Sequence, residues 1–284
     1  MTDRLFAPVA RGRVAALRTV LYLFIPVDVL LTTTWVARHA DVPASLYQPL
    51  FVARVLHLPA PTALSIRLIE VLLLVAAVAA ATGRAPRLLG WAVFGLYTTW
   101  MFIAMSYGKV DHDRFAFLVA LAVMPTVGAA RWCDEREDSA SGWAISCIQL
   151  AVVLTYLLAT VAKLRFGDGL NWANGATFTT AVIRRGTFLG HPLLDYPSVL
   201  VAAQWGILAF ETCSPLMLLR NRLGHAYVVV AVLFHVVTFA TITIIFLPHV
   251  MCLLAWAPLE RVDARRAIAT ARSRVRGLLP DAAG

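Results

Sequence analysis

Lysine is the rarest charged residue in this chain. Arginine makes up 23 of the 25 basic residues, and the two lysines are Lys109 and Lys163. Charge is scarce in general, because 14% of the residues are charged while 60% are hydrophobic. This composition excludes a soluble globular domain, in which about 25% of residues are charged. It is typical of a chain embedded in a lipid bilayer.

Cysteine motifs and long polar stretches are also missing. The four cysteines are scattered without a C-x-x-C pair, so neither a disulfide framework, a zinc site nor any other metal is indicated. No polar stretch is long enough for a second folded domain. We therefore expect a transmembrane domain over 1–258 and a basic cytoplasmic tail over 259–284.

Apolar runs of roughly 17 to 23 residues mark the expected membrane spans. They predict an all-α integral membrane protein, a polytopic bundle of about eight helices that includes an uncleaved first span. The apolar stretch 226–258 is too long for one helix and is expected to split near residue 241. The other expected spans are 17–36, 63–82, 88–107, 115–130, 143–163 and 199–219.

The basic residues orient this bundle and account for the net charge of +9 without nucleic acid. They lie in short runs beside apolar segments; with the N-terminus inside, 16 fall on the inner side and 6 on the outer side. This asymmetry predicts an N-in, C-in protein of a bacterial cytoplasmic membrane. It places Lys109, Lys163, His249 and the loop 164–198 on the extracytoplasmic side.

Ionisable side chains within spans are costly unless they face protein, water or a partner. Arg67 and Glu70 are three residues apart on one helix face, which predicts a local ion pair. Asp28 and Glu211 are compatible either with structural pairing or with function. For His235, a role in packing and a role in chemistry carry equal weight.

Lys163 ends an apolar helix, and two interpretations of it remain open. A lysine at a helix end commonly extends its amine to the interface, which is the simpler interpretation. Alternatively, a desolvated amine can lose its proton and act as a base, whereas a guanidinium stays protonated. Thr160 and Tyr156, three and seven residues earlier, share its helix face and could line a pocket; Tyr156 could equally be an interfacial aromatic.

The segment KVDHDR (109–114) concentrates charge between two spans. It is compatible with a solvated hairpin that has no further role. As a site, His112 between two aspartates would hold its proton more tightly and could shuttle protons. The segment offers no second histidine at helical spacing, so no metal is predicted there.

Over 143–258 the chain resembles the horizontally transferred transmembrane (HTTM) domain family, which includes the membrane core of vitamin K-dependent gamma-carboxylase. The shared pattern is a tyrosine, a Lys-Leu pair seven residues later, a Trp-x-x-Gly motif, an acidic residue on a later helix, and a mid-span Phe-His pair. In this chain these are Tyr156, Lys163-Leu164, Trp172 with Gly175, Glu211, and Phe234-His235.

This resemblance implies an HTTM-like domain over 1–258 in which Lys163 is the base that deprotonates a reduced quinone, vitamin K or menaquinol. VDHDRF stands where the family has an Asn-Asn-His segment, so His112 is taken as its counterpart. The family's large lumenal portion has no equivalent here, so carboxylation of a protein is not expected. The predicted catalytic residues are Lys163, His235 and His112, supported by Tyr156, Thr160, Trp172, Glu211, Asp28 and Lys109.

Two other classes of function stay open. One is a non-enzymatic quinone-binding or anchor subunit with the layout of DoxX-like proteins. The other is a toxin-immunity or sensor protein that binds a peptide. A transporter is not favoured, because the sequence shows no inverted repeat. The expected partners are the lipid bilayer and a lipophilic small molecule or peptide.

Overall fold

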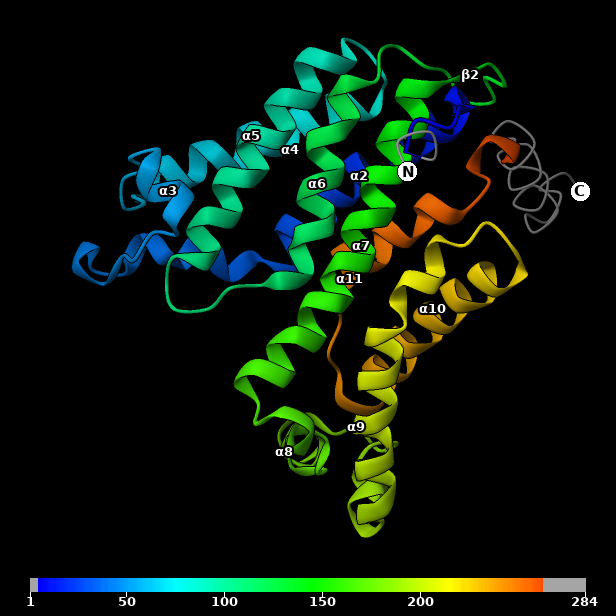
Figure 1. Ribbon diagram of the computed structural model, residues 1–284. Coiled ribbons are helices and arrows are strands. Elements are labelled where there is room, and N and C mark those ends of the chain that lie inside the picture. The colour runs from blue at the N-terminus through cyan, green and yellow to red at the C-terminus, as the bar shows by residue number, and fades with distance from the viewer. Residues whose placement is uncertain (1–4, 263–284) are drawn as a thin grey trace, which may run out of the picture. The chain divides into compact units, whose positions relative to one another are not determined.

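The chain is almost entirely helical, which confirms the predicted all-α class. The computed structural model describes residues 5–262 (Figure 1). Within these residues, the short strands β1 (Val9–Ala10) and β2 (Glu137–Asp138) form the only sheet, an antiparallel pair. Most of the predicted tail, 259–284, lies outside the described residues.

The described residues divide between two compact units. Unit 1 comprises 5–109, 121–146 and 257–262, and unit 2 comprises 110–120 and 147–256. Unit 1 contains α2 (Arg11–Val27), α3 (Phe51–Val55), α4 (Ala63–Ala81) and α5 (Pro86–Met105). Unit 2 contains α8 (Ala176–Arg185), α9 (Pro197–Thr212), α10 (Arg222–Ile242) and α11 (Leu247–Cys252), while α6 (Phe115–Val123) and α7 (Ser139–Phe166) have residues in both.

Short turns of tighter or wider helix connect these elements. A π turn over Asp28–Thr32 extends α2. The 3₁₀ turns are Thr34–Asp41, Ala44–Leu46, His112–Arg114, Met124–Thr126, Gly169–Ala173, His191–Asp195, Ser214–Leu218, Leu253–Trp256 and Leu259–Arg261.

Five described helices are long and apolar enough to cross a membrane. Several of their large apolar side chains are exposed, such as Leu64 at 78% and Val237 at 58%. Contact with lipid tails is more favourable than contact with water for exposed apolar side chains of this kind. The chain is therefore a multi-pass helical protein suited to a bilayer, with candidate spans at Arg11–Thr32, Ala63–Ala81, Pro86–Met105, Ser139–Phe166 and Arg222–Ile242.

The first span begins earlier than predicted. It covers Arg11–Thr32 instead of 17–36. The prediction was wrong because it started the helix after Arg11 and Arg13, whereas the fold gives the arginines of this helix partners within unit 1. Arg13 forms an ion pair with Glu260 at 2.8 Å, and the buried Arg18 donates to two backbone carbonyl oxygens at 3.3 and 3.4 Å.

Two other predicted spans are built from shorter helices, because prolines interrupt them. The segment 115–130 forms α6 and then a 3₁₀ turn that contains Pro125. Likewise, 199–219 forms α9 and then a 3₁₀ turn that contains Pro215. Proline lacks the N–H that a continuing α-helix needs. The predicted split of 226–258 near residue 241 is confirmed, since α10 ends at Ile242 and α11 starts at Leu247.

Unit 1 is organised around apolar helix contacts and a few satisfied polar groups. In Figure 1, α4 and α5 run side by side, and α2 packs against α4. Their core includes the fully buried Trp100 and Tyr97. The predicted ion pair between Arg67 and Glu70 is confirmed, with 2.9 Å between Nη1 and Oε2.

The start of α7 packs tightly against the N-terminal segment, which generates a stability prediction. A Cβ on the buried Gly142 would lie 2.0 Å from the carbonyl oxygen of Ala7. We expect Gly142→Ala to destabilise the protein by about 1–3 kcal/mol through overpacking. Thermal unfolding of the detergent-solubilised protein would measure this loss.

Gly95→Ala is the matched control, because no atom lies within 4 Å of the position that its Cβ would take on α5. There, alanine is expected to be neutral or to stabilise the helix by up to about 1 kcal/mol. Equal unfolding temperatures for both variants would contradict the proposed close packing at Gly142.

Candidate functional site

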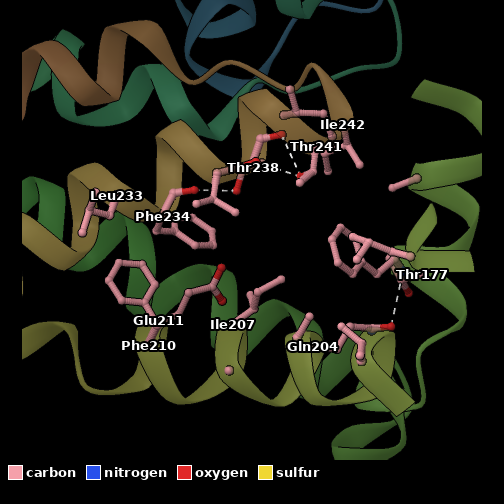
Figure 2. Close-up of a pocket in the computed structure, with 18 of the residues that line it drawn as sticks. Thr177, Gln204, Ile207, Phe210, Glu211, Leu233, Phe234, Thr238, Thr241 and Ile242 are labelled. Atoms are coloured by element: carbon pink, nitrogen blue, oxygen red, sulfur yellow. Dashed lines mark hydrogen bonds between the residues drawn. The ribbon is translucent and has the colours of Figure 1, made fainter. Parts of the chain in front are cut away.

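A cavity of about 620 Å³ opens within unit 2, lined by α8, α9, α10 and the segment after α10. Its walls are almost wholly apolar. Figure 2 shows Gln204, Ile207 and Glu211 along α9 on one side, with Phe234 and Thr238 of α10 on another. This size and lining suit a small lipophilic molecule.

One ion pair brings charge to this cavity. Among its described lining residues, Lys163 and Glu211 alone carry formal charges. The Lys163 Nζ donates to both carboxylate oxygens of Glu211 at 2.6 Å, and Thr160 Oγ1 donates to Glu211 Oε2 at 3.3 Å. The side chains of Lys163 and Glu211 are only 20% and 8% exposed. The Lys163 amine therefore does not extend alone to the interface, because its ion pair with the Glu211 carboxylate holds it at the cavity.

Trp172 positions this amine from the other side. The Lys163 Nζ lies 5.2 Å from the centroid of the Trp172 ring, within the range of a cation–π contact. The ring approaches closely because residue 167 is glycine: a Cβ there would lie 2.7 Å from the ring and 2.4 Å from the Lys163 carbonyl oxygen. Gly175, at a φ of +93°, supplies the left-handed turn that starts α8.

A second polar cluster packs behind the aromatic side chains of the cavity. The Tyr156 hydroxyl lies 2.7 Å from His235 Nε2, and its ring contacts that of His249 edge to face at 4.7 Å. His249 is 2% exposed, and neither of its ring nitrogens has a hydrogen-bond partner among residues 5–262. Phe210 and Phe246, which line the cavity, contact Tyr156 and His235 respectively. Buried imidazoles beside a cavity are candidates for proton transfer.

His112 lies at the edge of this cluster. It is exposed on the turn His112–Arg114, and its ring centroid is 6.4 Å from that of Phe246. His112, Glu211 and His249 all belong to unit 2. Burial raises the pKa of the neighbouring Asp113 carboxyl above its usual range.

Of the predicted supporting residues, Trp172 and Glu211 line the cavity, whereas Asp28 and Lys109 lie in unit 1. Asp28 belongs to unit 1, where it is fully buried and accepts a hydrogen bond from the Tyr97 hydroxyl at 2.8 Å. Lys109 also belongs to unit 1 and is not among the lining residues. The sequence grouped both with the pocket residues by residue type and position along the chain, which do not report contacts.

Sequence reasoning also missed two residues of the site. Gln204 is fully buried, lines the cavity and donates from Nε2 to the Trp172 carbonyl oxygen at 2.6 Å. Its signal was present, since it is the one amide within the apolar run of α9. His249 joins Tyr156 and His235, and its signal was a proline-interrupted polar spot in a late apolar segment.

Comparison of the chain with protein-family models, with curated proteins and with solved structures finds no match. The resemblance to the HTTM family therefore rests on the sequence alone, that is, on the order in which the shared motif residues occur along the chain. Chemically, the arrangement offers an apolar cavity whose polar end can donate and accept protons through Lys163 and Glu211.

The pairing of Lys163 with Glu211 generates a prediction about stability. We expect Lys163→Met to cost about 3 kcal/mol, because it leaves the Glu211 carboxylate buried without its counter-charge. Glu211→Leu is expected to lower stability by a similar amount, because it leaves the Lys163 ammonium without its counter-charge. Denaturant unfolding of the single and double variants would measure the coupling free energy.

The double variant Lys163→Met with Glu211→Leu serves as the control, because it removes both charges together. We expect it to be more stable than either single variant. Strictly additive losses would mean that the two side chains do not interact.

Proposed function

We propose that this chain is an HTTM-like membrane protein that binds a reduced quinone, or a similar lipophilic hydroxyl compound, in the unit 2 cavity and removes its hydroxyl proton. The observation that carries the proposal is the charged pair of Lys163 and Glu211 at an otherwise apolar cavity. Charged groups are retained in such surroundings where they serve a polar ligand group or a proton relay.

The residues fit such a ligand. The apolar side chains of α9 and α10 can receive a ring system and its hydrocarbon chain, and a cavity of about 620 Å³ is of the right order for one. A hydroxyl at the charged end would meet Lys163 and Glu211. A reduced quinone combines both features, since its hydroxyls are weakly acidic and its body is soluble in lipid.

The pair itself supplies the base. In a site of low polarity, a proton can pass from the Lys163 ammonium to the Glu211 carboxylate, which leaves two neutral groups. The neutral amine then takes the hydroxyl proton as the O–H bond breaks, and the resulting ammonium stabilises the oxyanion. Trp172 and Thr160 position the pair, while Tyr156, His235 and His112 carry protons away.

The membrane placement belongs to the same proposal. Eight crossings with both termini inside a bacterial cytoplasmic membrane put Lys163 on the extracytoplasmic side. This is the side on which the HTTM resemblance places quinol chemistry. A lipophilic ligand would reach the cavity through the bilayer.

A non-enzymatic quinone-binding subunit is the second candidate. It is favoured by the 2.6 Å contacts from Lys163 to both oxygens of Glu211, because such an ion pair holds the amine in its charged form. In that case the Lys163 ammonium would only donate a hydrogen bond to a bound quinone.

Turnover by the reconstituted protein tests the catalytic proposal. In air, a quinol and dioxygen would yield the quinone epoxide and water once the hydroxyl proton is removed. We expect the wild-type protein to form the epoxide of vitamin K or of menaquinone. Lys163→Arg should lower turnover by about 100-fold or more, because arginine keeps the charge but does not release its proton.

Lys109→Arg is the matched control, since it changes the other lysine, which lies outside the cavity. It should leave turnover unchanged. No turnover by the wild type, or equal turnover in Lys163→Arg, would refute base catalysis. Saturable quinol binding without turnover would instead support the non-enzymatic function.

A further inference from the structure

Unit 1 contains a separate cavity of about 580 Å³ that the proposed quinol chemistry does not use. It lies where α2, the turn between α4 and α5, and the segment 129–136 meet. Its lining is polar and basic, in contrast to that of the cavity in unit 2. The charged lining residues are four arginines and one aspartate: Arg18, Arg84, Arg131, Arg136 and Asp134.

The charges that line this cavity do not cancel. Asp134 accepts hydrogen bonds from Arg136 at 2.8 and 2.9 Å, and these bonds lower the pKa of Asp134 to about 2. Asp134 is thus ionised at neutral pH and is matched by Arg136. Within residues 5–262, the other three arginines have no carboxylate within ion-pair distance. The arginines that line this cavity therefore outnumber its carboxylates by three.

Arg18 is the most informative of these side chains. It is 1% exposed, so its guanidinium is almost fully removed from water. Its bonds to the carbonyl oxygens of Gly128 and Ala130 are long, at 3.3 and 3.4 Å, compared with the usual ~2.9 Å. A buried cation with neutral and weak partners is costly, and an anion beside it would offset that cost.

The position of the cavity indicates which anion is available. Arg84 lies in the turn between α4 and α5, which are two successive candidate membrane spans. Such a turn lies at the membrane surface, at the level of lipid phosphates. Arginine suits this chemistry, because its planar fork of N–H donors matches the geometry of phosphate oxygens.

We propose that the unit 1 cavity binds a phosphate group, from a phospholipid headgroup or from free phosphate, through Arg18, Arg84 and Arg131. This site is independent of the quinol site in unit 2. It would couple the stability of unit 1 to the anionic lipid around it, since a ligand that binds only the folded state stabilises that state.

The test uses the purified full chain and measures its unfolding temperature against added probes. Inorganic phosphate at constant ionic strength is one arm, with chloride as the comparison. Nanodiscs of phosphatidylglycerol are the other arm, compared with nanodiscs of phosphatidylcholine, whose headgroup is neutral overall. A saturable rise with phosphate identifies a free-anion site, and a rise confined to phosphatidylglycerol identifies a headgroup site; either result supports the proposal.

Substitutions assign the effect to the cavity. Arg84→Gln and Arg131→Gln should each raise the probe concentration for half-saturation about tenfold, the loss expected for one charged hydrogen bond. Arg84 and Arg131 are exposed, so their substitution should not prevent folding, and they test the proposal even if the buried Arg18→Gln variant does not fold. Arg87→Gln is the control, because it removes the same charge in the first turn of α5, outside the cavity.

Two outcomes would overturn the proposal. One is the absence of a saturable rise with either probe. The other is an equal weakening by Arg87→Gln and Arg84→Gln, which would mean that the probes respond only to overall positive charge.

Discussion

Two opposite charges held largely out of water, Lys163 and Glu211, are the constraint on which the candidate site depends. Removing either charge from water costs free energy, and the attraction between the two charges offsets this cost only when they lie close together. The 2.6 Å contacts, the hydroxyl of Thr160 and the Trp172 ring meet this condition. The apolar cavity therefore has a polar end in which each buried charge has a partner.

The surroundings of the pair follow from the same constraint. Glycine fits at position 167 because a Cβ there would lie only 2.7 Å from the Trp172 ring. Gln204 then fixes Trp172 through its backbone carbonyl oxygen. Behind Phe210, Tyr156 and His235 form a hydrogen-bonded pair next to the buried His249. Polar groups thus reach the cavity only where packing or a partner supports them.

The two units handle buried positive charge in different ways. In unit 2, the one cation of the cavity has a carboxylate of its own. In unit 1, the cavity is lined by an excess of arginines, and Arg18 is buried with carbonyl oxygens as its partners. The first arrangement suits the transfer of a proton, and the second suits the binding of an anion.

The sequence by itself determined the helical class, the candidate spans at α4, α5 and α10, and the Arg67–Glu70 pair, because periodicity, apolar length and i,i+3 spacing are local properties. It also placed Tyr156, Thr160 and Lys163 on one helix face. Tertiary structure alone decided that Lys163 meets Glu211, 48 residues away, that His249 joins Tyr156, and that Asp28 lies in the other unit. The physical reason is that these contacts depend on how separate helices pack, which no local pattern in the sequence specifies.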